Sequence, residues 1–422
     1  MITIRQLTSA DAEAADTLDT YAFVGDPSLE TAEHNTSELD WDRTFGAEHP
    51  DLPGRLAGLY TSYDLRVRVP GASCDGGTRA VPVDGLSWVA VHPDVRRRGV
   101  LAAMIRRHLE TARERGAAIA GLHASESGIY GRFGYGVASH DISYTLGRGT
   151  EFSVPESVSA EADRTTTHLL LDVDDDEIAR RACDVDAASS MLGEVALPYR
   201  LARRYLRDTP EGRRGREPMR GLVAVRDGRD VGMTFFSRKT SWGDDAGPGG
   251  TVTVHHLCAV DPAAMLALGR RLVDMDLMAR TEFAGRGLDD LLLVWAGSVR
   301  SRKVRVRDAL WLRPVDVGSM LAARGYAAAL DVVLEVTDPT CEWNRGAWRL
   351  VVDEHGEATC ERTRREAGVH LDVDVLGEMF LGLRGPAALA ASGRLREHTL
   401  GAVAAMTRAF ATGVLPIGGV GF

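Results

Sequence analysis

The sequence predicts three domains of α/β and α+β class, and three observations support this prediction. The chain has 422 residues, which is enough for about three domains of ~150 residues each. A strand, a loop and a helix follow one another over residues 86–112, and the same order returns over 252–275. Beyond residue 303, short strands precede helical stretches. We therefore expect domains over residues 1–150, 151–303 and 304–422.

The composition is that of an ordinary globular protein, with 44% hydrophobic and 26% charged residues. A formal net charge of −10 disfavours non-specific nucleic-acid binding and would attract cationic substrates such as polyamines and amino sugars. The five cysteines form no Cys-x-x-Cys pair and no Cys/His cluster at zinc spacing, so we expect free thiols and no metal. No leader sequence and no apolar run of ~18 residues is evident. We expect a cytoplasmic protein without a membrane span, and leaderless export stays open.

The first domain is expected to be of βαβ type. Met1–Leu7 alternates like a strand, and Ser9–Glu13 resembles the capped start of a helix. Residues 25–56 are rich in Pro, Asp, Glu and Gly, which favours loop and short helix. The other expected elements are a strand at Leu59–Arg68, a Gly-rich hairpin at Pro70–Arg79, and buried strands at Leu86–Val91 and Ala117–His123.

A run of arginines that ends in a glycine, Arg96–Gly99, separates the strand at Leu86–Val91 from an amphipathic helix. The predicted inner face of this helix holds Leu101, Met104, Ile105, Leu109 and Ala112. Backbone N–H groups and a helix N-terminus at one place can hold a pyrophosphate, and Gly99 lets a ligand approach the backbone. The loop lacks Gly-x-Gly-x-x-Gly and Gly-Lys-Ser/Thr, which excludes the dinucleotide and P-loop patterns. A solvated arginine run is the alternative.

The middle domain is predicted to follow a linker at residues 150–166. A hairpin over Gly221–Phe236 turns at Asp227-Gly228, and a strand at Val252–Val260 leads through Asp261-Pro262 into a helix. The inner face of that helix would hold Met265, Leu268, Leu272 and Met275. Since its loop has no arginine run, we expect a second copy of the first arrangement without a phosphate cradle. In the third domain, expected strands at Val333–Val336, Trp348–Val352 and Val369–Val373 precede Leu376–Leu383 and a helical stretch around Leu389–Phe410.

Two segments carry a resemblance to a known family. Arg96-x-x-Gly99 after a strand resembles the acyl-CoA loop of the GNAT N-acetyltransferases and departs from its usual form at Leu101. The segment His123–Gly136 is similar to the signature of the Eis (enhanced intracellular survival) family of actinobacterial GNAT acetyltransferases, and Leu321–Tyr326 and the terminal Phe422 agree with it. The resemblance implies two tandem GNAT-like domains followed by a sterol-carrier-like domain, acetyl-CoA as cosubstrate, no metal, and a homohexamer.

The loop and the resemblance together predict a cofactor site in the first domain. The residues expected to bind acetyl-CoA are Val89, Ala90, Val91, Arg96, Arg97, Arg98, Gly99, Val100, Leu101, Ala102 and Ser125. The backbone N–H groups of Val89–Val91 are candidates for polarising the thioester carbonyl, because oxyanion donors are commonly main-chain groups.

Tyr130 is the candidate general acid that protonates the departing thiolate. The pKa values of a tyrosine and a thiol are about 10 and 8.5, close enough for proton transfer. The resemblance implies this role for the tyrosine of the Ile-Tyr-Gly-Arg segment, which is Tyr130. Tyr135 is a rival within the same segment, and a core or turn tyrosine is the structural alternative. His92, His108, His123 and His140 are expected to be structural or surface residues.

For the base, the resemblance implies the C-terminal carboxylate of Phe422. The tail before it is apolar, which fits burial of Val414, Leu415, Ile417 and Val420, while Gly421 replaces an acidic residue of the family. A substrate pocket for cationic amines is expected to draw on Asp26, Glu30 and Trp41. The predicted acceptors are primary amines of polycationic small molecules, such as aminoglycosides and polyamines, or lysine side chains. The alternatives are a dedicated protein-lysine acetyltransferase, and a non-enzymatic lipid-binding or interaction protein that uses the third domain.

Overall fold

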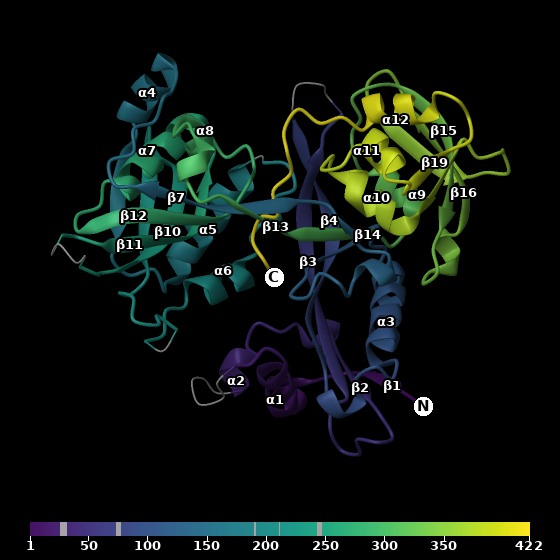
Figure 1. Ribbon diagram of the computed structural model, residues 1–422. Helices are drawn as coiled ribbons and strands as arrows, with labels where there is room; N and C mark the ends of the chain where they lie inside the picture. Colours follow the sequence, from purple (N-terminus) through teal and green to yellow (C-terminus); the bar gives the residue numbers. More distant parts are fainter. Residues whose placement is uncertain (26–31, 73–76, 190, 211, 243–246) are drawn as a thin grey trace. The chain divides into compact units, whose positions relative to one another are not determined.

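The chain forms two compact units (Figure 1). The computed structural model describes residues 1–25, 32–72, 77–189, 191–210, 212–242 and 247–422. The first unit comprises residues 1–139, 308–416 and 421–422, and the second comprises residues 140–307 and 417–420. This division differs from the predicted boundaries at 150 and 303, because the chain enters the second unit at His140 and returns to the first near Asp308.

The first unit contains a seven-stranded sheet in the order β1-β2-β3-β4-β5-β14-β6. Its strands are β1 (Thr3–Gln6), β2 (Thr44–Glu48), β3 (Gly58–Pro70), β4 (Thr78–Val91), β5 (Ile119–His123), β14 (Leu310–Pro314) and β6 (Gly136–Val137). Its helices are η1 (Ser9–Asp11), α1 (Ala12–Ala22), α2 (Ala32–Asn35), η2 (Trp41–Arg43), η3 (Pro93–Val95), α3 (Val100–Glu114) and η4 (Gly131–Phe133).

The sheet is completed by β14, which the sequence analysis assigned to the third domain. Leu312 pairs antiparallel with Gly121 of β5 on one side and with Gly136 of β6 on the other. All of β14 is buried. A strand that reaches its partners only after the chain has built another unit leaves no local pattern, so the sequence could not assign it to this sheet.

Helix α3 lies along β3 and β4 (Figure 1). It buries Met104, Ile105, Leu109 and Ala112 as predicted, whereas Leu101 is only partly buried. These apolar side chains join those of the sheet in one core cluster. The helix thereby fixes its own N-terminus at the end of β4, directly after the arginine loop.

The second unit contains a seven-stranded sheet in the order β13-β7-β12-β11-β10-β9-β8. Its strands are β13 (Arg305–Asp308), β7 (His140–Gly147), β12 (Met278–Arg286), β11 (Gly250–Ala259), β10 (Arg229–Lys239), β9 (Arg220–Arg226) and β8 (Thr166–Leu170). Its helices are α4 (Glu156–Asp163), α5 (Asp176–Ala188), α6 (Tyr199–Leu206), α7 (Pro262–Val273), α8 (Leu291–Trp295) and η5 (Val299–Ser301).

Two details of the second unit differ from the predictions. The expected linker at 150–166 contains helix α4. Because only Ala162 of this helix is buried, its sequence is polar and lacks the apolar periodicity that predicts a helix. Met275 lies beyond the end of α7, although Met265, Leu268 and Leu272 are buried on that helix as predicted. The predicted hairpin is present as β9 and β10, and Asp227 and Gly228 both have positive φ, as a two-residue turn requires.

The remaining part of the first unit is a five-stranded sheet in the order β17-β16-β15-β18-β19. Its strands are β15 (Leu330–Thr337), β16 (Gly346–Val352), β17 (Ala358–Arg362), β18 (Val369–Asp372) and β19 (Leu395–Glu397). Its helices are α9 (Val317–Ala322), η6 (Glu342–Asn344), α10 (Val373–Phe380), α11 (Pro386–Ala391) and α12 (Ala402–Ala409). The helical stretch expected around Leu389–Phe410 is therefore two helices separated by β19.

Glycines of the segment His123–Gly136 let α10 pack directly on the first sheet. A Cβ at Gly136 would lie 2.0 Å from the carbonyl oxygen of Asp374, and one at Gly134 would lie 2.6 Å from Val373. Gly134 also has a φ of 84°, which a larger residue adopts only with strain. This part of the segment therefore holds helix α10, and the five-stranded sheet that it belongs with, against the first sheet.

A fully buried ion pair joins β14 to the loop after β15. Arg313 and Asp338 are both 0% exposed, with 3.0 Å between Nη2 and Oδ1. The Asp338 carboxylate also accepts hydrogen bonds from the backbone N–H groups of Thr340 and Cys341.

Replacing Asp338 by alanine should therefore lower the free energy of unfolding by about 3–5 kcal/mol, because Arg313 is left buried and unpaired. Chemical denaturation measures this loss. Asp331→Ala is the matched control, since its pair with Arg349 is solvent-exposed and should matter little. Equal stability of the Asp338→Ala variant and the control would contradict the prediction.

Candidate active site

Strands β4 and β5 pair only briefly and then diverge. They run parallel at Asp84–Ala120 and Gly85–Gly121, with no further pairing beyond these positions along the described strands. Just past this point Trp88 has a φ of 54°, and the register of β4 against β3 shifts there. Such a bulge redirects the strand and leaves backbone groups without a strand partner. The segment Val89–Val91 thus pairs with β3 on one side and lies beyond the last pairing of β4 with β5 on the other.

The arginine loop lies between the end of β4 and α3. Gly99 is the N-cap of α3 with a φ of 87°, and no side chain caps this helix end. The Ala103 N–H donates to the Gly99 carbonyl, which closes the first turn. The N–H groups of the preceding helical residues, Val100–Ala102, then point out of the helix N-terminus. This is the arrangement that binds phosphate oxygens.

The positive charge of this loop is carried by solvent-exposed side chains. Arg96, Arg97 and Arg98 are all exposed, and Arg98 pairs with Asp51. The space beside Gly99 is open, because the nearest atom to an added Cβ is a methyl group of Ile2 at 3.8 Å. An exposed cationic loop at an uncapped helix N-terminus is suited to a polyphosphate ligand.

The corresponding helix of the second unit, α7, differs from α3 because a side chain caps its N-terminus. The carboxylate of Asp261 caps α7 by accepting from Ala264 N–H, and Pro262 is its first residue. Strands β11 and β12 also pair briefly and diverge. Arg286 spans that region, donating to the Leu257 carbonyl at 2.5 Å and to Asp290 at 2.8 Å. A carboxylate thus caps the helix end and an arginine crosses the diverging strands, unlike the arginine loop of the first unit.

Tyr130 and Tyr135 differ in burial. Tyr130 is the N-cap of η4 and is 8% exposed, while Tyr135 is 0% exposed and its hydroxyl is enclosed. Their rings meet edge to face at 6.0 Å. Burial, with a smaller effect of Glu126, raises the pKa of Tyr130 to about 12. Of the two, only Tyr130 keeps part of its surface exposed.

The chain ends where β4 and β5 diverge. The ring of Phe422 meets that of His123 edge to face at 5.1 Å, and a Cβ at Gly85 would lie 2.8 Å from the Phe422 ring. Gly85 and His123 are thus the residues that receive the terminal side chain. Neither residue is predicted from the sequence to belong to the site, although the position of His123 at the carboxyl end of a parallel strand is a signal that could have indicated it.

The tail before Phe422 is only partly buried. Ile417 is 7% exposed and Val420 is half-buried, but Val414 and Leu415 are 49% and 37% exposed. The expectation that all four apolar residues are buried was therefore wrong for Val414 and Leu415. In the second unit, Ile417 N–H donates to the Leu192 carbonyl and Gly418 N–H to the Asp141 carboxylate. Two backbone N–H hydrogen bonds and the burial of Ile417 thus hold this segment.

The other predicted site residues are less informative. Ser125 is exposed just after β5. Trp41 begins η2, is half-buried, and accepts a hydrogen bond from Gln6 through its carbonyl. Asp26 and Glu30 lie outside the residues that the structure describes.

A largely buried polar cluster supports β4 at Asp84. Arg43 donates to Asp84 at 2.9 Å, and His108 of α3 lies 3.6 Å from the other carboxylate oxygen. Burial lowers the pKa of His108, which favours the neutral imidazole. His108 is thus a structural residue, as predicted.

Comparisons with known proteins agree with this architecture. GNAT acetyltransferase domain models match residues 3–138 and 199–314, and a sterol carrier protein domain model matches residues 317–417. The predicted fold class, two GNAT domains followed by a sterol-carrier-like domain, is confirmed. The GNAT fold implies that the protein uses acetyl-CoA. In the described part of the chain, no helix has both the length and the apolar character needed to cross a membrane.

Relatives extend over nearly the whole chain. A Streptomyces avermitilis protein named as an uncharacterized N-acetyltransferase is 38% identical over 387 residues, 89% of this chain and 88% of that one. N-acetyltransferase Eis of Mycobacterium tuberculosis is 30% identical over 373 residues, 86% of this chain and 85% of that one. The crystal structure of Eis1 from Mycobacterium abscessus matches with a TM-score of 0.80, at 30% identity and with complete coverage of both chains. The chain is therefore an N-acetyltransferase and belongs to the Eis family of GNAT proteins.

Proposed function

We propose that this enzyme transfers the acetyl group of acetyl-CoA directly to a primary amine of a polycationic small molecule, such as an aminoglycoside or a polyamine, or of a lysine side chain. The observation that carries this proposal is the chain end. Phe422 contacts His123 at the point where β4 and β5 separate. We propose that its terminal carboxylate faces the backbone groups of Val89–Val91 that would bind the thioester.

In the proposed reaction, the amine nitrogen forms a bond to the thioester carbonyl carbon and the C–S bond breaks. Backbone N–H groups of Val89–Val91 stabilise the charge on the carbonyl oxygen. The hydroxyl of Tyr130 gives its proton to the departing thiolate, and the carboxylate of Phe422 accepts the amine proton, directly or through a water molecule. A carboxylate of pKa about 3.5 is a weak base in water. A partly dehydrated position would raise this pKa and so favour the role of base.

The cofactor is proposed to bind only at the first domain. Its phosphates would contact the side chains of Arg96, Arg97 and Arg98, and the backbone N–H groups of Gly99, Val100, Leu101 and Ala102, with Ser125 nearby. The contrast with the capped, arginine-filled region of the second unit supports this assignment. By resemblance to the family we also propose a homohexamer, which analytical ultracentrifugation would measure.

Gly99→Val should weaken acetyl-CoA binding by at least about 10-fold, a loss of ~1.4 kcal/mol. The added side chain would stand between the phosphates and the backbone N–H groups, while its Cβ would meet the protein only at a methyl group of Ile2, 3.8 Å away. Isothermal titration with acetyl-CoA measures the loss. Gly116→Val is the matched control, since Gly116 also has a positive φ, 79°, and open space, but lies at the other end of α3.

Equal loss of binding in both variants would show that strain alone is responsible. A wild-type protein that shows no thermal shift with acetyl-CoA would favour the non-enzymatic alternative, in which the sterol-carrier-like domain carries the function.

The acceptor class is tested by a panel of amines at fixed acetyl-CoA. Aminoglycosides and polyamines should react faster than neutral amines of similar size, because a pocket with a terminal carboxylate and aromatic rings attracts cations. Replacing the predicted pocket residues Asp26, Glu30 or Trp41 should raise KM for cationic acceptors more than for neutral ones. Faster reaction of neutral or anionic acceptors would contradict the proposed substrate class, and preference for peptide lysines would favour a protein-lysine acetyltransferase.

A further inference from the structure

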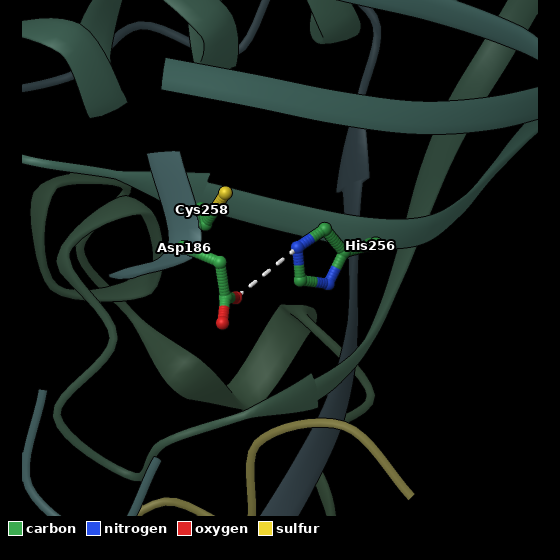
Figure 2. Close-up of side chains that lie close together, drawn as sticks. All are labelled: Asp186, His256 and Cys258. Atoms are coloured by element: carbon green, nitrogen blue, oxygen red, sulfur yellow. Dashed lines mark ion pairs between the residues drawn. The ribbon is translucent and has the colours of Figure 1, made fainter. Parts of the chain in front are cut away.

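Three potential metal ligands meet inside the second unit, whereas the arginine loop belongs to the first. Asp186 belongs to α5, whereas His256 and Cys258 lie two residues apart on β11 and point to the same face (Figure 2). A carboxylate oxygen, a ring nitrogen and the Sγ atom all lie within 4.8 Å of one another. Asp186 is 1% exposed and Cys258 is 0% exposed. Side chains of this kind seldom gather in a protein interior without an interaction that stabilises them.

The spacing within the cluster fits a shared ion better than a direct contact. His256 Nε2 and Asp186 Oδ1 are 3.6 Å apart, whereas an N–H···O hydrogen bond measures about 2.7–3.2 Å. Two nitrogen or oxygen ligands on a tetrahedral zinc ion, each at about 2.0–2.1 Å from it, lie ~3.4 Å apart. The Nε2 atom is buried and makes no hydrogen bond to any residue in the described part of the chain.

We propose that Asp186, His256 and Cys258 bind one divalent transition-metal ion of the zinc class, at a site separate from acetyl transfer. Thiolate, imidazole and carboxylate are the zinc ligands of proteins, and three of them leave a fourth tetrahedral position for water or another donor. The Cys258 thiol donates a long hydrogen bond of 3.7 Å to the Met233 carbonyl. On binding, the ion takes the place of that thiol proton.

The sequence could not predict this site. His256-x-Cys258 offers only two ligands on one strand, and the third comes from a helix in a separate segment. Pairing of β10 with β11 and packing of α5 against both strands bring the three together. The other face of β11 behaves differently, since the neighbouring His255 ring lies 2.8 Å from the Ser237 hydroxyl.

An ion here would fix the end of α5 and the segment that follows it. The second carboxylate oxygen of Asp186 accepts from Leu197 N–H at 2.8 Å. Between these residues, Leu192 accepts a hydrogen bond from Ile417 of the C-terminal tail. The ion would therefore stabilise the part of the second unit that receives residues 417–420.

The test begins with full-length protein stripped by a chelator and then titrated with zinc chloride in competition with a chromophoric chelator. We expect one zinc ion per chain by elemental analysis and a rise in the thermal midpoint. Cys258→Ala and His256→Gln should each weaken zinc binding by at least about 100-fold, because even the partners of metal ligands contribute about 10–100-fold. His255→Gln and Cys360→Ala are the matched controls, because each also removes one histidine or one cysteine but leaves the cluster intact. Both should bind zinc like the wild type.

Cobalt(II) gives a second readout that does not depend on comparing stabilities. Bound cobalt should show a thiolate charge-transfer band and the intense visible bands of tetrahedral coordination. The thiolate band should disappear in the Cys258→Ala variant and persist in the Cys360→Ala variant. Sub-stoichiometric binding to the wild type, or unchanged affinity in both cluster variants, would overturn the proposal without bearing on the acetyltransferase activity.

Discussion

Replacing Tyr130 by phenylalanine is expected to lower the turnover number by about 10²–10⁴-fold, the usual contribution of general acid–base catalysis. The change removes only the hydroxyl, so the ring that contacts Tyr135 remains. Affinity for acetyl-CoA should stay close to that of the wild type, since Tyr130 acts on the departing sulfur and not on the phosphates. Steady-state kinetics and titration with acetyl-CoA separate these two effects.

The control is Tyr135→Phe. Its hydroxyl is enclosed and makes no hydrogen bond within the described structure, so its loss should cost little stability or activity. If Tyr135→Phe abolished turnover while Tyr130→Phe retained it, the roles of the two tyrosines would be reversed.

The pH dependence provides an independent check on Tyr130. Burial raises its pKa to about 12, so the hydroxyl keeps its proton throughout the range in which the enzyme can be assayed. Turnover should therefore show no loss between about pH 8 and 10, where an ordinary tyrosine begins to ionise. A falling limb in that range that is present in the wild type and absent from Tyr130→Phe would contradict the raised pKa.

Local patterns allowed much of the fold to be predicted from the sequence. The periodicity of residues 101–112 predicts α3 because one face of a helix must be apolar, and Gly99 marks its start because its backbone has a positive φ. The two elements that the sequence did not predict correctly, β14 and α4, share a physical cause, since neither has a distinctive local pattern. Strand β14 depends on pairing with a sheet formed far earlier in the chain, and α4 is too polar and too exposed for its composition to distinguish it from a linker.

The candidate site shows the same contrast between local motifs, which can be read from the sequence, and contacts between distant segments, which cannot. The arginine loop and Tyr130 lie within short motifs that a sequence can display. The positive φ of Trp88, the space that Gly85 leaves for Phe422, and the meeting of His123 with the chain end depend on how strands diverge. Interactions of this kind join residues from opposite ends of the chain, so only a three-dimensional structure brings them together.

The position of the chain end makes extension of the C-terminus the most direct test of the proposed base. The Phe422 ring fills the space between Gly85 and His123, so added residues must either displace it or carry the carboxylate away.

A single glycine appended to Phe422 should lower turnover by at least about 100-fold, because the ring can remain in place while the carboxylate moves beyond the amine. Phe422→Leu keeps a carboxylate at the same chain length and should lose less activity, and the same glycine added before Met1, which is fully exposed, should have no effect. Acetyl-CoA binding should survive in all three variants, since the arginine loop is untouched. If the extended enzyme turned over like the wild type, the carboxylate could not be the base, and His123, whose ring lies against Phe422, would become the group to replace next.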